Sequence, residues 1–257
     1  MADWNPGLYL KFESDRTKPI ADLLSHVHLN EPRRIVDIGC GPGNSTRFLA
    51  QKWPDAELIG LDNSSAMLET ARKSMPEIQW IEHDATGDLS ALGKFDLMFS
   101  NAALQWMQDH ARVVPNLFRL LNPGGVFAVQ IPHNYDSPLH QAMQNLAIET
   151  WHRKLEPRNL NFNPAGYYYD ILSKLSSTFE LWGTSYYHVL ESHENIIEWY
   201  KGTGLRPYLD QLNPEDQELF LDDMLEIIRP LYPAQADGKI LFDFKRLFFT
   251  ATKEEAP

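Results

Sequence analysis

The sequence predicts an α/β fold built on a mostly parallel β-sheet. Short apolar runs alternate with helix-like stretches between residues 33 and 131, which is the pattern of repeated βαβ units. A cluster of glycines directly follows the first apolar run. Two more apolar runs, at 179–190 and 240–252, are separated by helical segments. These late runs predict an antiparallel hairpin at one edge of the sheet, with the inserted helices folding over its carboxyl end.

Five strands and three connecting helices can be placed in the first half of the chain. The first strand is rich in β-branched residues and ends at the glycine cluster. The second strand follows a helical stretch that ends before Pro54. The turn Asn122-Pro123-Gly124-Gly125 precedes the fifth strand. We expect strands over 34–38, 57–62, 79–84, 95–100 and 126–131, and helices over 45–52, 65–74 and 111–121.

Beyond Pro132 the strand-helix repeat stops and helical patterns dominate. We expect helices around 139–154, 165–175, 194–203 and 214–231. The whole chain, 1–257, is expected to form one domain. Its predicted parts are an N-terminal flap at 1–30, a cofactor-binding core at 31–135, helical lid or substrate segments at 136–177 and 191–239, and edge strands at 178–190 and 240–253.

Composition limits the classes of function. Of the 257 residues 43% are hydrophobic and 23% charged, which excludes a disordered chain. The net charge of −12 repels a phosphate backbone, so we expect no nucleic-acid partner. A single cysteine, Cys40, excludes an internal disulfide and a cysteine-based zinc site, and we expect no metal. Because no apolar run approaches the roughly 18 residues of a membrane span, we expect a cytoplasmic protein that does not bind membranes.

The most informative stretch is Asp37-Ile38-Gly39-Cys40-Gly41-Pro42-Gly43-Asn44-Ser45-Thr46, which lies between a predicted strand and a predicted helix. Its three glycines permit tight backbone dihedrals and let a ligand approach the main chain where no Cβ intrudes. Glycine turns also occur without ligands. Here, however, Asp62 ends the next strand, and ligands of parallel sheets bind beyond the carboxyl ends of such strands. The stretch therefore favours nucleotide binding.

The spacing of the glycines narrows the choice of nucleotide. A dinucleotide fingerprint requires a glycine where this chain has Asn44, and no Gly-Lys-Ser/Thr follows to make a triphosphate loop. An NAD-dependent oxidoreductase is therefore disfavoured. Asp37 at the mouth of the turn repels phosphate but suits a ligand that carries an ammonium group. These features predict an amino-acid nucleoside as the ligand.

The stretch Val36 to Gly43 resembles the first motif of the class I S-adenosylmethionine-dependent methyltransferases. The resemblance covers about residues 9–131 and implies a Rossmann-like sheet with S-adenosylmethionine as methyl donor. It implies that Gly39 and Gly41 lie under the methionine part of the cofactor and that Asp62 accepts from both ribose hydroxyls. The residues it implies for cofactor binding are Asp37, Gly39, Gly41, Asp62, Asn63, Met67, Asp84, Ala85 and Asn101.

Some of these positions have a second interpretation. Asn63 and Met67 are expected to flank the adenine and Asp84 with Ala85 to read its amino edge, but Met67 is equally expected in the core. Asn101 opens Asn101-Ala102-Ala103-Leu104-Gln105-Trp106, where the family brings cofactor and acceptor together. This stretch lacks the Asn/Asp-Pro-Pro-Tyr/Phe pattern of amino-group nucleic-acid methyltransferases. We expect Trp106 to pack in the core.

A narrower resemblance, to methyltransferases that esterify trans-aconitate, involves both ends of the chain. It rests on Asp3-Trp4-Asn5-Pro6-x-x-Tyr9-x-x-Phe12-x-x-x-Arg16-x-x-Pro19 and on Gly202-Thr203-Gly204-Leu205-Arg206-Pro207-Tyr208. It implies that a carboxylate of this small acid attacks the cofactor methyl group. Another small or carrier-bound carboxylic acid is the alternative acceptor, and a cofactor-binding module without catalysis is the alternative class.

The expected chemistry needs alignment more than side-chain chemistry. A carboxylic acid with a pKa of about 4 is ionised at neutral pH, so no general base is required. Candidates for holding the substrate are Arg206, Arg16, His133 and Tyr9, of which Arg206 is also expected to pair with Asp210 four residues on. We expect His110 and Arg112 on the surface, and the tyrosines 167–169 in the lid, where packing is the more common role of an aromatic run.

Overall fold

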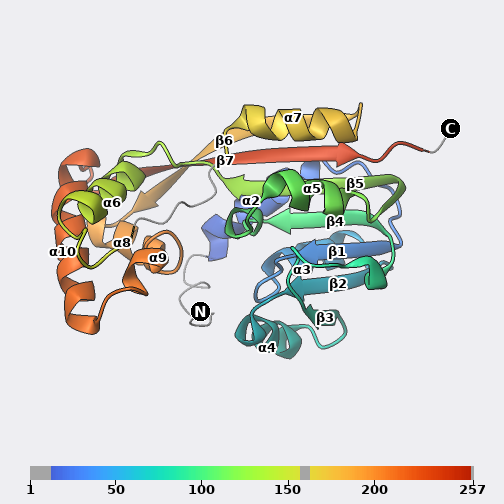
Figure 1. Ribbon diagram of the computed structural model, residues 1–257, viewed down its shortest axis with the longest axis horizontal. Helices are drawn as coiled ribbons and strands as arrows, with labels where there is room; N and C mark the ends of the chain where they lie inside the picture. Colours follow the sequence, from blue (N-terminus) through green and yellow to red (C-terminus); the bar gives the residue numbers. More distant parts are fainter. Residues whose placement is uncertain (1–12, 157–162, 256–257) are drawn as a thin grey trace. The chain divides into compact units, whose positions relative to one another are not determined.

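The computed structural model describes residues 13–156 and 163–255, with side chains from residue 17 onward within those ranges. Its strands are β1 (Arg34–Ile38), β2 (Glu57–Asp62), β3 (Gln79–Glu82), β4 (Phe95–Asn101), β5 (Leu121–Pro132), β6 (Phe179–Leu190) and β7 (Ile240–Thr252). They form one sheet in the order β3-β2-β1-β4-β5-β7-β6 (Figure 1). The first five strands pair in parallel, and β7 pairs antiparallel with β5. The predicted mostly parallel sheet with an antiparallel strand near one edge is confirmed.

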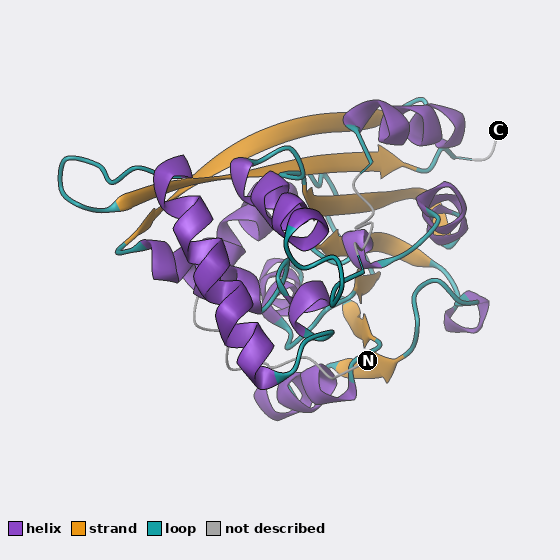
Figure 2. Cartoon of the chain, turned by 60° about the vertical axis from the view of Figure 1, so that its left-hand side comes forward, coloured by secondary structure: helices purple, strands orange, loops and turns teal. Residues whose placement is uncertain are grey.

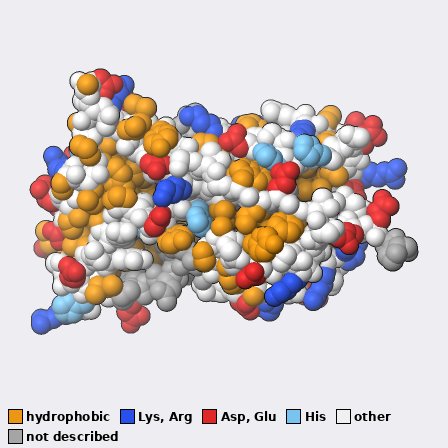
Figure 3. All heavy atoms as spheres, turned by 90° about the horizontal axis from the view of Figure 1, so that it is seen from above, with side chains coloured by type: hydrophobic (Ala, Val, Ile, Leu, Met, Phe, Trp, Pro, Cys, Tyr) orange, Lys and Arg blue, Asp and Glu red, His pale blue; other side chains and the backbone are white. Residues whose placement is uncertain are grey.

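Helices occupy most of the remaining described chain. They are α2 (Glu13–Ser25), α3 (Asn44–Lys52), α4 (Ser65–Ser74), α5 (His110–Phe118), α6 (Pro138–Glu149), α7 (Ala165–Leu175), α8 (His193–Lys201), α9 (Arg206–Leu209) and α10 (Pro214–Leu231), with the 3-10 turns η1 (Ser90–Leu92) and η2 (Leu104–Trp106). In the described part of the chain, no helix is both long and apolar enough to cross a membrane. Side chains of both charge signs are interspersed over the face seen in Figure 3.

The largest difference between the predicted and the observed strand bounds is in β5. β5 begins at Leu121 instead of 126, and the register with β4 shifts between the pairs Phe95↔Leu121 and Leu97↔Val126. The turn at 122–125 is thus absorbed into the strand as an irregularity. For the same reason the preceding helix, α5, ends at Phe118 rather than at 121.

The described residues form two compact units, which divide within β6 and β7. The sheet unit contains residues 13–132, 163–184 and 246–255, and the helical unit contains 133–156 and 185–245. α7 belongs to the sheet unit, although we expected residues 136–177 to belong to a lid. The reason is that Tyr168 and Leu172 of this helix are fully buried in the core of the sheet unit.

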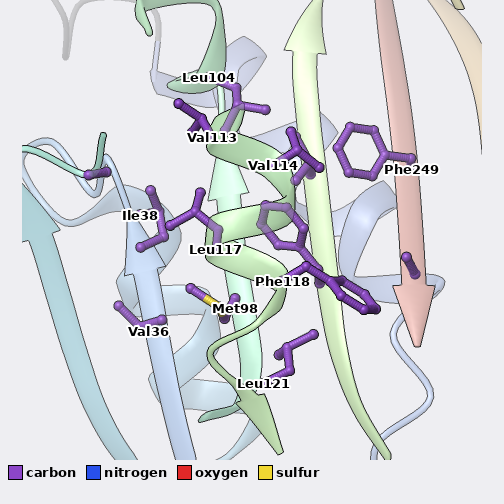
Figure 4. Packing of buried hydrophobic residues seen from close by; sticks show 14 of the residues in the cluster. Val36, Ile38, Met98, Leu104, Val113, Val114, Leu117, Phe118, Leu121 and Phe249 are labelled. Atoms are coloured by element: carbon purple, nitrogen blue, oxygen red, sulfur yellow. The ribbon is translucent and has the colours of Figure 1, made fainter. Parts of the chain in front are cut away.

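The core of the sheet unit lies between β1, β4, β5 and β7 and the helices α5 and α7. Figure 4 shows Val113, Val114, Leu117 and Phe118 of α5 directed at the apolar side chains of the strands. α5 has apolar residues at the spacing of one helix face, so a single face of it supplies these contacts. This packing covers one face of the sheet with apolar side chains.

The helical unit has its own buried centre. α10 packs against α6 and α8, and Phe220 of α10 stacks on Tyr208 with ring centroids 5.9 Å apart. The helices of this unit are among those drawn in purple in Figure 2. Asn213 caps α10 by accepting a hydrogen bond from the Asp216 amide at 2.9 Å, and Pro214 follows as the first helical residue.

Candidate functional site

The strand order brings most of the predicted cofactor residues to one edge of the sheet unit. β3, β2, β1 and β4 are neighbours and parallel, so their carboxyl ends lie along the same edge. Asp62 is the last residue of β2 and Asn101 the last of β4, while Gly39 follows β1 and Asp84 follows β3. Residues from four separate segments are thereby collected at one edge, as the sequence predicts for a nucleotide site.

The glycine turn after β1 has the backbone that the sequence implied. Gly39, Gly41 and Gly43 have φ values of +69°, +55° and +96°, in the left-handed region that favours glycine. A Cβ at Gly39 would lie 2.2 Å from the Cβ of Ala103, whereas a Cβ at Gly41 would meet nothing within 4 Å. Gly39 is therefore required by the contact with the loop after β4, and Gly41 borders open space.

Asp37 is a fully buried carboxylate at the base of this turn. Its Oδ2 accepts hydrogen bonds of 2.7 Å from the hydroxyls of Ser45 and Thr46, in the first turn of α3. Its Oδ1 is buried with no hydrogen-bond partner among the described residues. The pKa of Asp37 is raised to about 6, mainly by burial; the hydrogen bonds from Ser45 and Thr46 lower this pKa and the nearby Asp62 carboxylate raises it.

Asp62 connects the turn to the end of β2. One carboxylate oxygen accepts from the Gly41 amide at 2.8 Å and the other from the Ser64 amide at 2.9 Å. A carboxylate oxygen can accept more than one hydrogen bond. The main chain therefore holds the carboxylate at the glycine turn.

The loop after β4 carries strained and unsatisfied groups. Ala102 has a φ of +55°, which is unusual for a residue with a Cβ. The side-chain amide of Gln105 donates to the Ala102 carbonyl at 2.6 Å, which holds this conformation. The Oδ1 of Asn101 and the Oε1 of Gln105 are buried and accept no hydrogen bond from the described residues. Two buried acceptors thus lie in the loop where the resemblance implies that cofactor and acceptor meet.

The expected adenine residues have contrasting environments. Asn63 is exposed, and Met67 is 3% exposed in α4, so its side chain packs in the core, one of the two interpretations left open for it. Asp84 is exposed, and its Oδ1 accepts from the Thr86 amide and hydroxyl, both at 2.8 Å. Ala85 beside it is buried.

The substrate candidates lie elsewhere. Arg206 begins α9 and His133 directly follows β5, and both belong to the helical unit. The Arg206 side chain is 17% exposed, and its Nε lies 3.6 Å from the Asp210 carboxylate, the expected ion pair. Tyr9 lies outside the described residues, and Arg16 is in α2 with its side chain outside them.

Two expectations about the surface were wrong. His110 is 1% exposed: its Nε2 donates to the carbonyls of Leu104 (2.8 Å) and Met107 (3.0 Å), so its Nδ1 is the acceptor for the Tyr168 hydroxyl at 2.7 Å. Asp109, with a φ of +56°, turns the chain so that the first helical residue points inward. Trp106, expected in the core, is 38% exposed because Leu104 takes the buried side of the short 3-10 turn.

Sequence reasoning missed two polar residues near this edge. Gln130 of β5 is fully buried, and Arg246 of β7 is 5% exposed. Both interrupt apolar strands, Ala128-Val129-Gln130-Ile131 and Arg246-Leu247-Phe248-Phe249. That interruption is the signal that identifies them, since a buried polar residue in a strand needs a partner or a role.

Comparison with known proteins identifies related methyltransferases. A family model described as a methyltransferase domain matches residues 35–125. The trans-aconitate 2-methyltransferase of Enterobacter sp. (strain 638) is 43% identical over 254 residues, covering 99% of this chain and 100% of that protein. The enzyme of the same name from Rhodopseudomonas palustris (strain BisB18) is 45% identical over 257 residues, with 98% and 100% covered.

Solved structures share the fold at low sequence identity. The YcgJ protein of Bacillus subtilis aligns with a TM-score of 0.64 at 15% identity, over 93% of this chain and 99% of that one. A phosphoethanolamine N-methyltransferase of Haemonchus contortus, solved with S-adenosylhomocysteine, aligns with a TM-score of 0.55 at 18% identity, over 93% of this chain and 53% of that one.

The sheet order, the glycine turn and the matched domain define a class I S-adenosylmethionine-dependent methyltransferase. The similarity to curated relatives extends over nearly the full length of both chains. The chain belongs to the trans-aconitate 2-methyltransferase family.

Proposed function

We propose that the protein transfers a methyl group from S-adenosylmethionine to a carboxylate of trans-aconitate, giving the monomethyl ester and S-adenosylhomocysteine. The observation that carries the acceptor is the identity of 43% to a trans-aconitate 2-methyltransferase over 99% of this chain and all of that one. The partner is then a small carboxylic acid. The net charge of −12 supports the absence of a nucleic-acid partner. A cytoplasmic location belongs to the same proposal.

The residues at the sheet edge suit S-adenosylmethionine. The open space beside Gly41 admits the ligand to the main chain, and the carboxylate of Asp62 at the end of β2 suits the two ribose hydroxyls as an acceptor. The buried Oδ1 of Asn101 is an acceptor for the ammonium group. An anionic pyrophosphate would instead face the carboxylates of Asp37 and Asp62, which disfavours a dinucleotide.

The proposed reaction places modest demands on the chain. When bound, S-adenosylmethionine supplies a methyl group on a positively charged sulfur, from which a carboxylate oxygen displaces the neutral thioether. Because the acceptor is already ionised at neutral pH, the protein has no proton to remove. Its task is to align the two reactants and to exclude water, which otherwise stabilises their charges. Ala102 and Ala103, which follow β4, have small side chains, and we expect them to leave room for this approach.

Arg206 is our proposed clamp for a carboxylate of the acceptor. Its side chain is only 17% exposed, which is low for an arginine whose sole role is a surface ion pair. Its planar guanidinium donates two parallel hydrogen bonds to one carboxylate. His133, Arg16 and Tyr9 remain further candidates for contacting the acceptor.

The test is turnover of labelled S-adenosylmethionine against a panel of free and carrier-bound carboxylic acids. We expect trans-aconitate to give the highest kcat/KM and a monomethyl ester that mass spectrometry identifies. If another acid gives the highest kcat/KM, that acid replaces trans-aconitate as the proposed acceptor, and the proposed methyl transfer to a carboxylate stands. Absence of S-adenosylhomocysteine formation with every acid would contradict catalysis and favour a binding module.

A second measurement isolates the cofactor site. Asp62→Ala is expected to weaken S-adenosylhomocysteine binding by about 1.5–3 kcal/mol, because a charged hydrogen-bond acceptor is lost. Since Asp62 also holds the amides of Gly41 and Ser64, the unfolding curve of the variant must be measured in parallel. Unchanged affinity in a folded variant would remove Asp62 from the site.

A further inference from the structure

Gln130 and Arg246 form a buried polar pair on neighbouring strands of the sheet unit. Nη1 of Arg246 donates to Oε1 of Gln130 at 3.1 Å. Gln130 is fully buried and Arg246 is 5% exposed. The pair lies at the carboxyl end of β5, where Pro132 is the register partner of Arg246. An arginine in this position places a positive charge inside the protein at the edge that carries the cofactor residues.

The strand registers show which face of the sheet the pair occupies. Asn101 is the register partner of Gln130, and the amide of Ala102 donates to the Gln130 carbonyl at 2.9 Å. Register partners point to the same face, and so do residues two apart on one strand. By this rule Arg246, Gln130 and Asn101 share a face.

The same rule extends this face to the cofactor turn. Phe99 lies two residues before Asn101 on β4 and is the register partner of Asp37 on β1. Asp37 accepts from Ser45 and Thr46 of α3, so this is the α3 face of the sheet. The Gln130–Arg246 pair therefore lies one strand beyond Asn101, on the side where the loop after β4 meets the glycine turn.

The hydrogen bond between the two residues determines how the side-chain amide of Gln130 is oriented. A guanidinium only donates, so the Gln130 oxygen must face Arg246 and the Gln130 amide nitrogen must face away. That Nε2 is buried and has no hydrogen-bond partner among the described residues. Buried donors of this kind are normally satisfied, which points to an acceptor supplied by a ligand.

We propose that Arg246 and Gln130 bind a carboxylate of the acceptor, the one that is not methylated. A carboxylate has two oxygens and complements a guanidinium in both charge and planar geometry, while a second donor from Gln130 adds direction. This inference rests on the proposed function, because it assigns a further contact for the same acceptor. It makes the pair a determinant of specificity for acids with more than one carboxylate.

Two conservative variants test the proposal. Arg246→Lys keeps the charge and removes the fork. Gln130→Glu is nearly isosteric but neutralises Arg246 and repels an incoming carboxylate. We expect each to raise KM for trans-aconitate at least tenfold and to narrow the preference for the tricarboxylate over acids with fewer carboxylates. Arg34→Lys is the matched control, since Arg34 pairs with Glu57 at the opposite edge of the sheet, and it should keep the wild-type KM.

Calorimetry shows whether the pair binds a carboxylate of the acceptor or the methionine carboxylate of the methyl donor. We expect both variants to bind S-adenosylhomocysteine within twofold of the wild type, and trans-aconitate, added with S-adenosylhomocysteine present, at least tenfold more weakly. Loss of S-adenosylhomocysteine affinity with an unchanged KM would assign the pair to the methionine carboxylate and overturn the proposal. If folded variants keep both the wild-type affinity for S-adenosylhomocysteine and the wild-type KM, the pair is only a structural contact and the proposal is overturned as well.

The binding measurement also separates the two proposals from each other. If the wild type binds trans-aconitate without methylating it, and the variants bind it weakly, the proposed function fails while the carboxylate site stands. If the wild type methylates trans-aconitate and the variants bind it normally, the site fails while the function stands.

Discussion

Adding one methyl group at Gly41 is expected to separate cofactor binding from folding. A Cβ at Gly41 meets no atom within 4 Å, so the cost to the fold is the backbone strain of a φ of +55°, about 1–2 kcal/mol. The same methyl group occupies the open space through which the ligand approaches the main chain. Overpacking of this kind costs about 1–3 kcal/mol, so Gly41→Ala should weaken S-adenosylhomocysteine binding roughly 5- to 150-fold. Gly41→Val should abolish it.

Gly39→Ala is the matched comparison, because its φ is similar but its surroundings are filled. The new Cβ would lie 2.2 Å from that of Ala103, so the loop after β4 must move. Strain and overpacking together predict a loss of about 2–5 kcal/mol in the free energy of unfolding. This variant should therefore lose more stability than Gly41→Ala.

Urea unfolding and calorimetry with S-adenosylhomocysteine measure the two effects on the same samples. The expected result is a folded Gly41→Ala protein with weak ligand binding and a less stable Gly39→Ala protein. Native affinity in Gly41→Ala would refute the ligand's approach at Gly41. Equal loss of stability in the two variants would refute the contact assigned to Gly39.

Three further outcomes are expected. The pKa of Asp37 is raised to about 6 in the folded protein, whereas the unfolded chain loses this proton near pH 4. The free energy of unfolding should therefore fall by roughly 3 kcal/mol between pH 4 and 6, relative to that of Asp37→Asn. Parallel pH profiles of the two proteins would contradict this. Tyr168→Phe should cost about 1–3 kcal/mol in urea unfolding, because it leaves the buried Nδ1 of His110 without the hydroxyl, and a wild-type midpoint would exclude that bond. Arg206→Lys should lower kcat/KM for trans-aconitate about tenfold, or 1.4 kcal/mol, with unchanged cofactor affinity; near-native kinetics in Arg206→Met would leave only the ion pair with Asp210.

The strands and the cofactor turn were predictable because their signals are local. The glycine turn lies within one short stretch of sequence. Gly39, Gly41 and Gly43 indicate a left-handed φ there, because glycine has no side chain to oppose it. The position of Asp62 at the end of a strand follows from the apolar run before it. Parallel connection then places such strand ends at a common edge, so the cofactor region could be predicted before any tertiary contact was known.

The environment of each side chain was decided by partners far away in the sequence. His110 opens a helix and has a polar ring, which favours the surface, yet the hydroxyl it accepts from belongs to Tyr168, 58 residues later. Gln130 and Arg246 are 116 residues apart and meet only because β7 pairs antiparallel with β5 in one particular register. A shift of that register by one residue would turn Arg246 to the opposite face. The sequence by itself thus determined the α/β fold, the glycine turn and the class of ligand. Only the tertiary structure decided which polar groups are buried, because burial and strand register are properties of the packed sheet and not of any local segment.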